Sequence, residues 1–575
     1  MTIFVKNTLL ASVARFFLWW REMLRSFSFR DKCIMSSLLF IIVGAFTYWG
    51  VAWYKQLTKE IPDFGGAYIE GVVGSPLYIN PVLAKVGGPH YDLSRLIFSG
   101  ILEYAPDGSL RNDMAKDWIV SEDGKIYTVF LKQNVLWHDG RIVTADDIIF
   151  TIEVIKNLAF KSPLREAWLN VNVSRGEDNY TIIFTLDSPR ADFVELLTTG
   201  ILPKHAWENV TPENFPLHSL NLEPIGNGPY KFERSQKDDS GKILIYEIAS
   251  FQEYYQKEPY INSMVFKFYP DRESLLDAYK NKEVKSMNGI DSWVWEGLGD
   301  YRDRLRLHAI ENPNYYVVYF NQNKSEALSY EEVRRALSLA TDKQQLIKEI
   351  FYEKATIVSN PFLGESEDGE ERLSSWEFRK EEANALLEEK GWIRSEDGIR
   401  EKDGVRLEFD MLTTDWREFT VGGDILAKQW SEIGVRINTK VVSVYDLWNN
   451  FIRPREYEML FSAHMTTLIP DIYPFWHSSR TKDPGLNFSV YKNDALDVLI
   501  EDLRVSRDEE KRKALIQGIE QIFEKDIPAL YLFSADYLYP IDKKVQNISV
   551  SRVSEDADRF FDVENWYIKT KRVWK

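Results

Sequence analysis

The chain has 575 residues, which is too many for one hydrophobic core, so we expect two or three domains. Hydrophobic residues make up 44% and charged residues 28%, as in an ordinary globular protein. The net charge of −17 argues against nucleic acid as a partner, and the single cysteine, Cys33, excludes an intramolecular disulfide.

The first element in chain order is the uncharged run 33–54, CIMSSLLFIIVGAFTYWGVAWY. As a helix it would extend over roughly 33 Å, enough to cross a bilayer. The alternative of a buried core helix is weakened by the complete absence of charge. The run is too long for the core of a cleaved signal, no small-x-small site follows it, and Cys33 precedes it rather than following it as in a lipoprotein. We therefore predict an uncleaved transmembrane anchor over 33–54.

The charge around this run predicts its orientation. Residues 1–32 contain six Lys and Arg but only two acids, and a short basic flank stays in the cytoplasm. The main domain then lies outside the cell membrane as part of a single-pass protein. Residues 11–27 suit either an amphipathic helix on the inner leaflet or a disordered tail. We expect a linker over 55–63.

The stretch 135–150, VLWHDGRIVTADDIIF, concentrates one histidine and three aspartates, which could be metal ligands or an acid–base set. Asp139 belongs to the last of three Asp-Gly pairs, at 107–108, 123–124 and 139–140, which separate β-prone runs as hairpin turns do. Thr144 precedes Asp147 by three residues, the spacing of a helix cap, and Asp146 suits the same first turn. These acids therefore have scaffold roles, and His138 alone makes a poor metal site.

The second half predicts alternating helices and strands, and therefore an α/β lobe, whereas the first half is rich in strands and hairpins. Capping-box spacing places helix starts at Ser329 and Thr341. Further helices are predicted over 378–390, 424–433, 493–503 and 508–523, and strands over 405–412, 435–442 and 456–463.

No spacing typical of catalysis is present. The seven histidines include no i, i+2 or i, i+4 pair, and neither a G-x-S-x-G elbow nor a phosphate-binding P-loop occurs. The element GNGPY at 226–230 lacks the third glycine of a dinucleotide loop. We expect no catalytic residue, no metal and no cofactor, although a two-carboxylate glycosidase stays open. Trp293, Trp295, Trp448 and Trp476 lie in loop-like surroundings, where each could fill a core or line a ligand cleft.

An ordered series of segments resembles a known family. GSPLYINPVL, SRLIFSGILEYAPDG, the block around VLWHDGRIVTADDIIF, PIGNGPYKF, YYVVYFNQNK and IPALYLF follow one another as in the extracytoplasmic solute-binding proteins of ABC transporters, oligopeptide/dipeptide-binding class, family 5. The resemblance covers about residues 65–550. PIGNGPYKF carries Asn227 where the family has threonine.

The resemblance implies an α/β fold with two lobes of the periplasmic-binding-protein type, a ligand between the lobes and closure by a hinge. Lobe 1 would span 64–317, with a hairpin-rich subdomain inserted at about 96–199. Lobe 2 would span 318–530, and residues 531–575 would return to lobe 1. The crossovers between the lobes are expected near 316–321 and 530–535.

The resemblance also suggests where a ligand binds. Family members often hold a peptide ammonium with an aspartate just before a Pro-Asp pair, but here HMTTLIPDIYPFWHSS (464–479) has Thr466 and Thr467 at that place. Either Asp471 takes the role or the contact is absent. We expect these residues to bind ligand: Asp471, Trp476, Trp293, Trp295, Asn80 and Tyr316.

We therefore predict a non-enzymatic, monomeric receptor that delivers peptide-like ligands to an ABC permease. Relatives that carry sugars or nickel chelates keep other solutes open as ligands. The alternatives are a cell-surface hydrolase and a peptide-holding chaperone or sensor without a permease.

Overall fold

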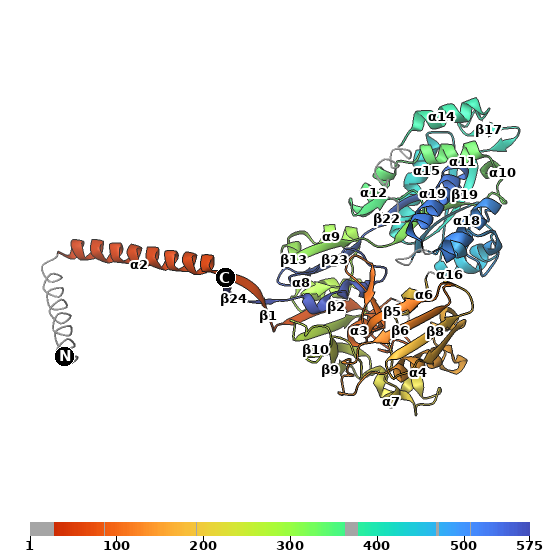
Figure 1. Ribbon diagram of the computed structural model, residues 1–575. Coiled ribbons are helices and arrows are strands. Elements are labelled where there is room, and N and C mark those ends of the chain that lie inside the picture. Colours follow the sequence, from red (N-terminus) through yellow and green to blue (C-terminus); the bar gives the residue numbers. More distant parts are fainter. Residues whose placement is uncertain (1–27, 85–86, 191, 363–377, 467–470, 507) are drawn as a thin grey trace, which may run out of the picture. The chain divides into compact units, whose positions relative to one another are not determined.

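The computed structural model describes residues 28–84, 87–190, 192–362, 378–466, 471–506 and 508–575 (Figure 1). The chain divides into two compact units, Met1–Asp63 with Lys569–Lys575, and Phe64–Ile568. The predictions for 11–27, and most of that for 1–32, lie outside the described residues.

The first unit contains a long helix followed by a two-stranded ribbon. Helix α2 (Phe29–Leu57) begins at a capping box between Ser28 and Asp31, and none of its residues is buried. Strand β1 (Thr58–Asp63) pairs antiparallel with β24 (Lys569–Trp574). The segment expected to be a linker, 55–63, thus forms the end of α2 and β1, and β24 pairs with β1. The pairing joins opposite ends of the sequence, so no local pattern could reveal it.

The second unit contains two lobes. The sheet of lobe 1 is formed by β2 (Ala67–Val73), β9 (Tyr230–Lys237), β10 (Ile243–Ser250), β11 (Ser263–Tyr269) and β12 (Ser286–Met287). Its order is β12-β2-β11-β10-β9, in which β2 runs parallel to β11 and β12 and the remaining pairs are antiparallel. Its helices are α3 (Pro89–Ile97), α8 (Arg272–Lys280) and α9 (Ser292–Gly297).

A hairpin-rich subdomain is inserted after α3. Its strands are β3 (Leu102–Tyr104), β4 (Leu110–Asn112), β5 (Ala115–Val120), β6 (Ile126–Leu131), β7 (Val171–Arg175) and β8 (Thr181–Leu186). Its helices are α4 (Ala145–Lys156), α5 (Arg165–Trp168), α6 (Phe193–Leu196) and α7 (Lys204–Trp207). The hairpins β3–β4 and β5–β6 turn at the first two Asp-Gly pairs, and Gly108, Gly124 and Gly140 have φ of 84°, 74° and 87°. The predicted turns are confirmed, since glycine adopts this left-handed region without strain.

Lobe 2 is built on a mixed sheet of β14 (Asn314–Phe320), β15 (Ala355–Ile357), β19 (Glu408–Thr414), β20 (Arg436–Val442), β21 (Met459–Met465) and β22 (Ala529–Ala535). Its order is β15-β22-β14-β21-β19-β20. Both faces are covered, because Val318 and Phe320 belong to one buried cluster and Val317 and Tyr319 to another. This two-sided burial explains why the central strand reads as the continuous apolar run YYVVYF. A small sheet adds β16 (Ile393–Arg394), β17 (Arg400–Lys402) and β18 (Val405–Arg406).

The helices of lobe 2 are α10 (Glu326–Ser329), α11 (Glu331–Leu339), α12 (Lys343–Phe351), α14 (Lys380–Glu389), α15 (Arg417–Ser431), α16 (Val444–Asp446), α17 (Tyr473–Trp476), α18 (Asp494–Val505) and α19 (Glu509–Asp526). The helices predicted over 378–390, 493–503 and 508–523 are confirmed within a few residues. The caps predicted at Ser329 and Thr341 are wrong: α11 follows Tyr330 without a side-chain cap, and Asp342 caps α12.

Helix α15 begins before the start predicted at 424. The glycine pair Gly422-Gly423, which directly precedes the predicted start, lies inside the helix. A Cβ atom on Gly422 would approach the ring of Phe461 to 2.9 Å, and one on Gly423 would approach Thr439 to 3.2 Å. These glycines therefore serve close packing of the helix on the sheet rather than ending it.

Two strand pairs carry the chain between the lobes. Strand β13 (Leu305–Ile310) of lobe 1 pairs with β23 (Tyr537–Asp542), and these strands adjoin β14 and β22 along the chain. The crossings thus lie at 311–313 and at Asp536. The segments 316–321 and 530–535, which we expected at the crossovers, lie within or at the end of the central lobe 2 strands. Their uninterrupted apolar character reflects burial in that sheet and not a hinge.

Candidate ligand-binding site

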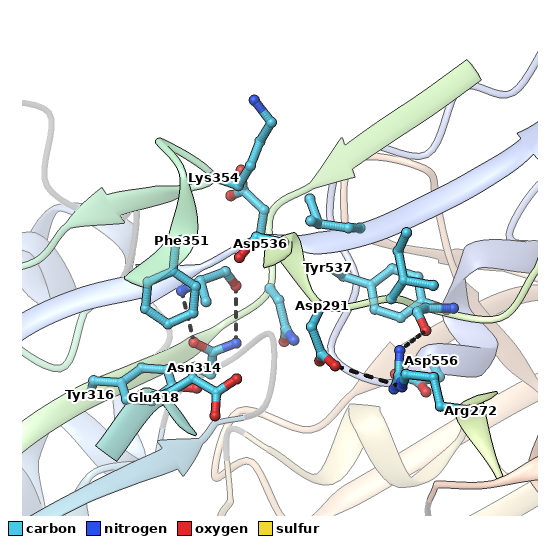
Figure 2. A pocket seen from close by; sticks show the side chains of 16 residues that line it. Arg272, Asp291, Asn314, Tyr316, Phe351, Lys354, Glu418, Asp536, Tyr537 and Asp556 are labelled. Atoms are coloured by element: carbon cyan, nitrogen blue, oxygen red, sulfur yellow. Dashed lines mark hydrogen bonds and ion pairs between the residues drawn. The ribbon is translucent and has the colours of Figure 1, made fainter. Parts of the chain in front are cut away.

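A cavity of about 240 Å³ lies where the chain crosses between the lobes. Lobe 1 contributes Arg272 and the segment 289–292, and lobe 2 contributes Phe351, Lys354 and Glu418 (Figure 2). The remaining wall comes from the crossing strands and from Asp556, which belongs to the short helix η8 (Asp556–Phe560). A ligand in this cavity would touch both lobes.

Asn314 holds the crossing strands together at the cavity. Its side-chain amide donates to the Ala535 carbonyl oxygen at 3.1 Å and accepts from the Ala535 N–H at 3.1 Å (Figure 2). The Ser534 hydroxyl also donates to the Asn312 carbonyl oxygen at 2.8 Å. These side chains continue the pairing of β14 with β22 beyond a register irregularity, so the cavity wall is built from defined strands.

The cavity has an acidic charge balance. Asp291, Glu418, Asp536 and Asp556 are opposed by Arg272 and Lys354, of which Arg272 lies 3.6 Å from Asp291. Burial, reinforced by the neighbouring Asp92, raises the pKa of Asp556 to about 6. Burial and the charge of Glu311 likewise raise the pKa of Asp536. The site therefore favours a ligand group that carries positive charge or donates hydrogen bonds.

A fully buried ionic cluster supports one side of the cavity. The Arg559 guanidinium donates to both carboxylate oxygens of Asp92, at 2.9 and 2.7 Å, and to Glu70 at 2.7 Å. Asn288 donates to Asp92 at 3.4 Å and accepts from the Tyr537 hydroxyl at 2.8 Å. Tyr537 lines the cavity, so its ring position depends on this cluster.

Of the six residues expected to bind ligand, only Tyr316 lines the cavity. Its ring lies in an aromatic cluster with Phe351, Phe419 and Phe533. Trp293 on α9 is 44% exposed and lies beside Ser292, a cavity residue. Trp295 on the same helix packs with its indole 5.6 Å from the Arg302 guanidinium.

Three other expected residues have structural partners. Asn80 and Trp476 are fully buried, so the structure places neither at the cavity. The Asn80 amide donates to Asn221 and accepts from the Val82 N–H, as an Asn-Pro turn requires. Asp471 pairs with Arg504 at 3.2 Å and accepts from the Tyr473 N–H at 3.1 Å. Its carboxylate is thus used in a turn and an ion pair, and burial raises its pKa.

The block 135–150 has the scaffold role that its sequence indicates. Thr144 and Asp147 form a capping box at the start of α4, and the Asp147 carboxylate also accepts from the Lys204 N–H at 2.9 Å. His138 Nε2 lies 3.0 Å from the Gly228 carbonyl oxygen, and Nδ1 accepts from the Gly226 N–H at 3.2 Å. The histidine therefore joins this block to GNGPY. Among the described residues, no group of three His, Cys, Asp or Glu is placed to hold a metal.

The sequence did not predict the four acids of the cavity, because they belong to no local motif. Asp291, Glu418, Asp536 and Asp556 come from four separate segments that only the crossing strands bring together. The one available signal was their proximity to the predicted crossovers, which identified Tyr316 but not the charged side chains.

The two α/β lobes and the cavity between them define a binding protein of the periplasmic-binding-protein type. Residues 109–485 match the bacterial extracellular solute-binding proteins, family 5 Middle, and the chain belongs to this family. Its members are non-enzymatic receptors of ABC transporters.

Named relatives agree with this assignment. The chain is 24% identical over 523 residues to the oligopeptide-binding protein AppA of Bacillus subtilis (strain 168), covering 88% of this chain and 92% of that protein. It is 24% identical over 524 residues to a dipeptide-binding protein of Escherichia coli (strain K12), covering 83% and 91%. The crystal structure of NikZ from Campylobacter jejuni in complex with Ni(L-His) is similar, with a TM-score of 0.66, 25% identity and coverage of 87% and 99%.

The chain is thus an extracytoplasmic solute-binding protein of family 5, in the oligopeptide/dipeptide-binding class of ABC transporter proteins. It carries an N-terminal apolar helix, α2, of the kind found in signal sequences and in membrane anchors.

Proposed function

We propose that the chain is a membrane-anchored receptor that clamps a peptide-like ligand between its lobes and delivers it to an ABC permease. The observation that carries this proposal is the cavity at the strand crossing, which both lobes line. A ligand that contacts both lobes favours the closed receptor by its extra affinity for that state. The cavity is small beside the roughly 300–1,000 Å³ of typical ligand pockets, so we infer that it holds one end or one side chain of the ligand.

The charges of the cavity support a ligand with a cationic group, such as a peptide ammonium or a basic side chain. Glu418 and Asp536 take the anchoring role in this proposal, because Asp471 is already paired with Arg504. Tyr316, Phe351 and the exposed Trp293 supply apolar surface beside these acids. Asp471 is the alternative anchor if a ligand displaces Arg504.

Contacts at the end of α2 support an anchor that is not removed. The Arg572 guanidinium donates to the Lys55 carbonyl oxygen at 3.1 Å and to the Thr58 hydroxyl at 2.9 Å. The Lys575 N–H donates to the Leu57 carbonyl oxygen at 3.0 Å. Cleavage after the helix would take away these partners of β24. The apolar side chains of α2 are also exposed along the whole helix, as a bilayer span requires.

Calorimetry with free and N-acetylated forms of one peptide tests ligand and anchor residue together. The peptide is chosen from those that co-purify with the full chain. If an acid holds the ammonium, wild type should prefer the free form by about 1–3 kcal/mol. Glu418→Gln should reduce that preference, while the exposed control Glu396→Gln should keep it. Equal binding of both forms by wild type would exclude ammonium recognition, and cleavage of the peptide would favour the hydrolase alternative.

The anchor has a separate test. Protease added to intact cells should degrade the main domain and leave the segment before α2 protected. Detection of a soluble mature protein that begins after Tyr54 would disprove the anchor without affecting the ligand proposal.

A further inference from the structure

The ribbon of the first unit is strongly basic although the whole chain is acidic. We define the basic ribbon as residues 55–63 and 569–575. It contains six Lys and Arg against Glu60 and Asp63, while the chain as a whole carries −17. We propose that the basic ribbon binds the anionic headgroups of phospholipids at the outer membrane surface. This inference rests on the anchor part of the proposed function.

Ion pairs within the basic ribbon use only two of its cations. Lys571 lies 2.9 Å from Asp63, and Arg572 lies 3.8 Å from Glu60 while its other nitrogens bind the end of α2. The remaining cations are exposed and have no ion-pair partner among the residues that the structure describes: Lys55, Lys59, Lys569 and Lys575. Four exposed lysines on one short ribbon are available to bind anionic groups from outside the chain.

Aromatic residues place the same ribbon at the depth of headgroups. Trp53 is 63% exposed at the end of α2, and Trp574 on β24 is 70% exposed. Trp574 contacts Tyr54 edge-to-face, with ring centroids 6.1 Å apart. Amphipathic rings of Trp and Tyr favour the membrane–water interface, with the apolar part buried and the polar edge wet. Because β1 begins directly after α2, its one lysine, Lys59, would lie next to these rings at the headgroup level.

The basic ribbon places positive charge outside the membrane, whereas the basic flank at 1–32 is expected to stay inside. The two do not conflict, because insertion into the membrane comes before β24 pairs with β1. Orientation in the membrane is set during insertion by charges close to the span in sequence. Lys569 and Lys575 are at the opposite end of the sequence and join the ribbon only when β24 pairs with β1, which brings Lys575 to the end of α2 and Lys569 opposite Asp63 at the other end of the ribbon. They therefore add positive charge outside the membrane without opposing the orientation that residues 1–32 impose.

The source of the counter-charge is the membrane because the ribbon continues a membrane-spanning helix. A lysine near an anionic surface strengthens attachment by about fivefold, as follows from roughly one kilocalorie per mole for each cation. The attraction is electrostatic and falls with ionic strength. This attraction would hold the basic ribbon against the bilayer. It would thereby reduce the distance from the membrane to which the main domain can extend.

The experiment places a fluorophore on the ribbon of the full chain in nanodiscs. Thr570→Cys provides the attachment point in a Cys33→Ser background, which removes the single natural cysteine. Nanodiscs contain phosphatidylcholine alone or with phosphatidylglycerol, together with a headgroup-linked quencher. The test variant changes Lys55, Lys59, Lys569 and Lys575 to Gln. The matched control changes the same number of exposed lysines on the second unit, Lys116, Lys237, Lys282 and Lys285.

Quenching should be stronger in anionic discs than in zwitterionic discs, and added salt should remove the difference. The test variant should also lose it, while the control variant should keep it. Equal quenching in both lipids for the wild type would overturn the proposal, and so would a lipid difference that survives in the test variant. A signal that appears only with a reconstituted permease would assign the ribbon to that protein and overturn lipid binding.

Failure of the anchor is recognised separately. A chain that does not enter the discs shows that α2 is not a membrane span, and then the anchor and the headgroup binding are both wrong, while the ligand proposal is unaffected. A chain that enters the discs but gives no lipid-dependent quenching retains its anchor and refutes only headgroup binding. The salt titration uses wild-type lysines, so this conclusion does not depend on how the test variant folds.

Discussion

His138 joins two segments that the sequence separates widely, and its removal should destabilise lobe 1. In the structure the ring binds the Gly228 carbonyl oxygen at 3.0 Å and the Gly226 N–H at 3.2 Å. It also contacts Phe251 edge-to-face, with ring centroids 4.9 Å apart. His138→Ala leaves two backbone groups without their partner, and Gly226 is buried. Unmet polar groups of this kind cost about 1–3 kcal/mol each, and water entering at the partly exposed ring would offset some of this, so we expect a net loss of about 2–4 kcal/mol at neutral pH.

The same histidine should make stability depend on pH. Burial lowers the pKa of His138 to about 4, whereas the unfolded value is near 6.5. The unfolded chain therefore binds more protons between these values, so stability is present above the unfolded pKa and is lost as pH falls toward the folded pKa. Between about pH 7.5 and about pH 5 this residue should remove up to about 2 kcal/mol from wild type. The alanine variant should lack this component.

Urea unfolding of the detergent-solubilised full chain at both pH values measures these effects. His205→Ala is the matched control, because His205 makes a partly exposed polar contact with Asp139 at 2.8 Å and should cost about 0–1 kcal/mol. Ligand binding by folded His138→Ala should persist after treatment with a chelator. Loss of binding with unchanged unfolding, or loss of stoichiometric metal, would refute the scaffold role.

Three further changes test the packing around the site. Asp147→Ala should cost about 2–3 kcal/mol in urea unfolding, because the carboxylate accepts hydrogen bonds from the N–H groups of both Thr144 and Lys204. The first-turn control Asp146→Ala should cost under about 1 kcal/mol. Equal effects of the two changes would contradict a bridging role for Asp147. Gly226→Ala would bring a Cβ to 1.9 Å from the Ile97 carbonyl oxygen and should lower the melting temperature clearly, whereas Gly297→Ala meets nothing within 4 Å and should be close to neutral; a neutral Gly226→Ala would refute this close approach. Arg559→Met should cost about 3–5 kcal/mol by leaving Glu70 and Asp92 buried without a cation. Burial already raises the pKa of Glu70, and loss of the Arg559 charge should raise it further. The variant should therefore recover stability as pH falls in melting experiments, and loss of stability toward low pH would contradict this.

Local chemistry was enough to predict much of the scaffold. The Asp-Gly turns, the Thr144–Asp147 cap, most lobe 2 helices and the apolar helix at 33–54 depend on interactions within a few residues, which the sequence displays directly. The ordered resemblance added the two-lobed class. The start of α15 was predicted at 424 but lies at Arg417, and close packing on the sheet accommodates Gly422 and Gly423 inside this helix.

By itself, the sequence determined the family, the α/β class and the apolar N-terminal helix, because these follow from periodicity, turn chemistry and the order of segments. Only the tertiary structure decided which side chains meet. It buried Asn80 and Trp476, and it gathered Asp291, Glu418, Asp536 and Asp556 around one cavity. It also paired 58–63 with 569–574. Such contacts join residues far apart in the sequence, and their energies depend on burial and on neighbouring charges that exist only once the chain has folded.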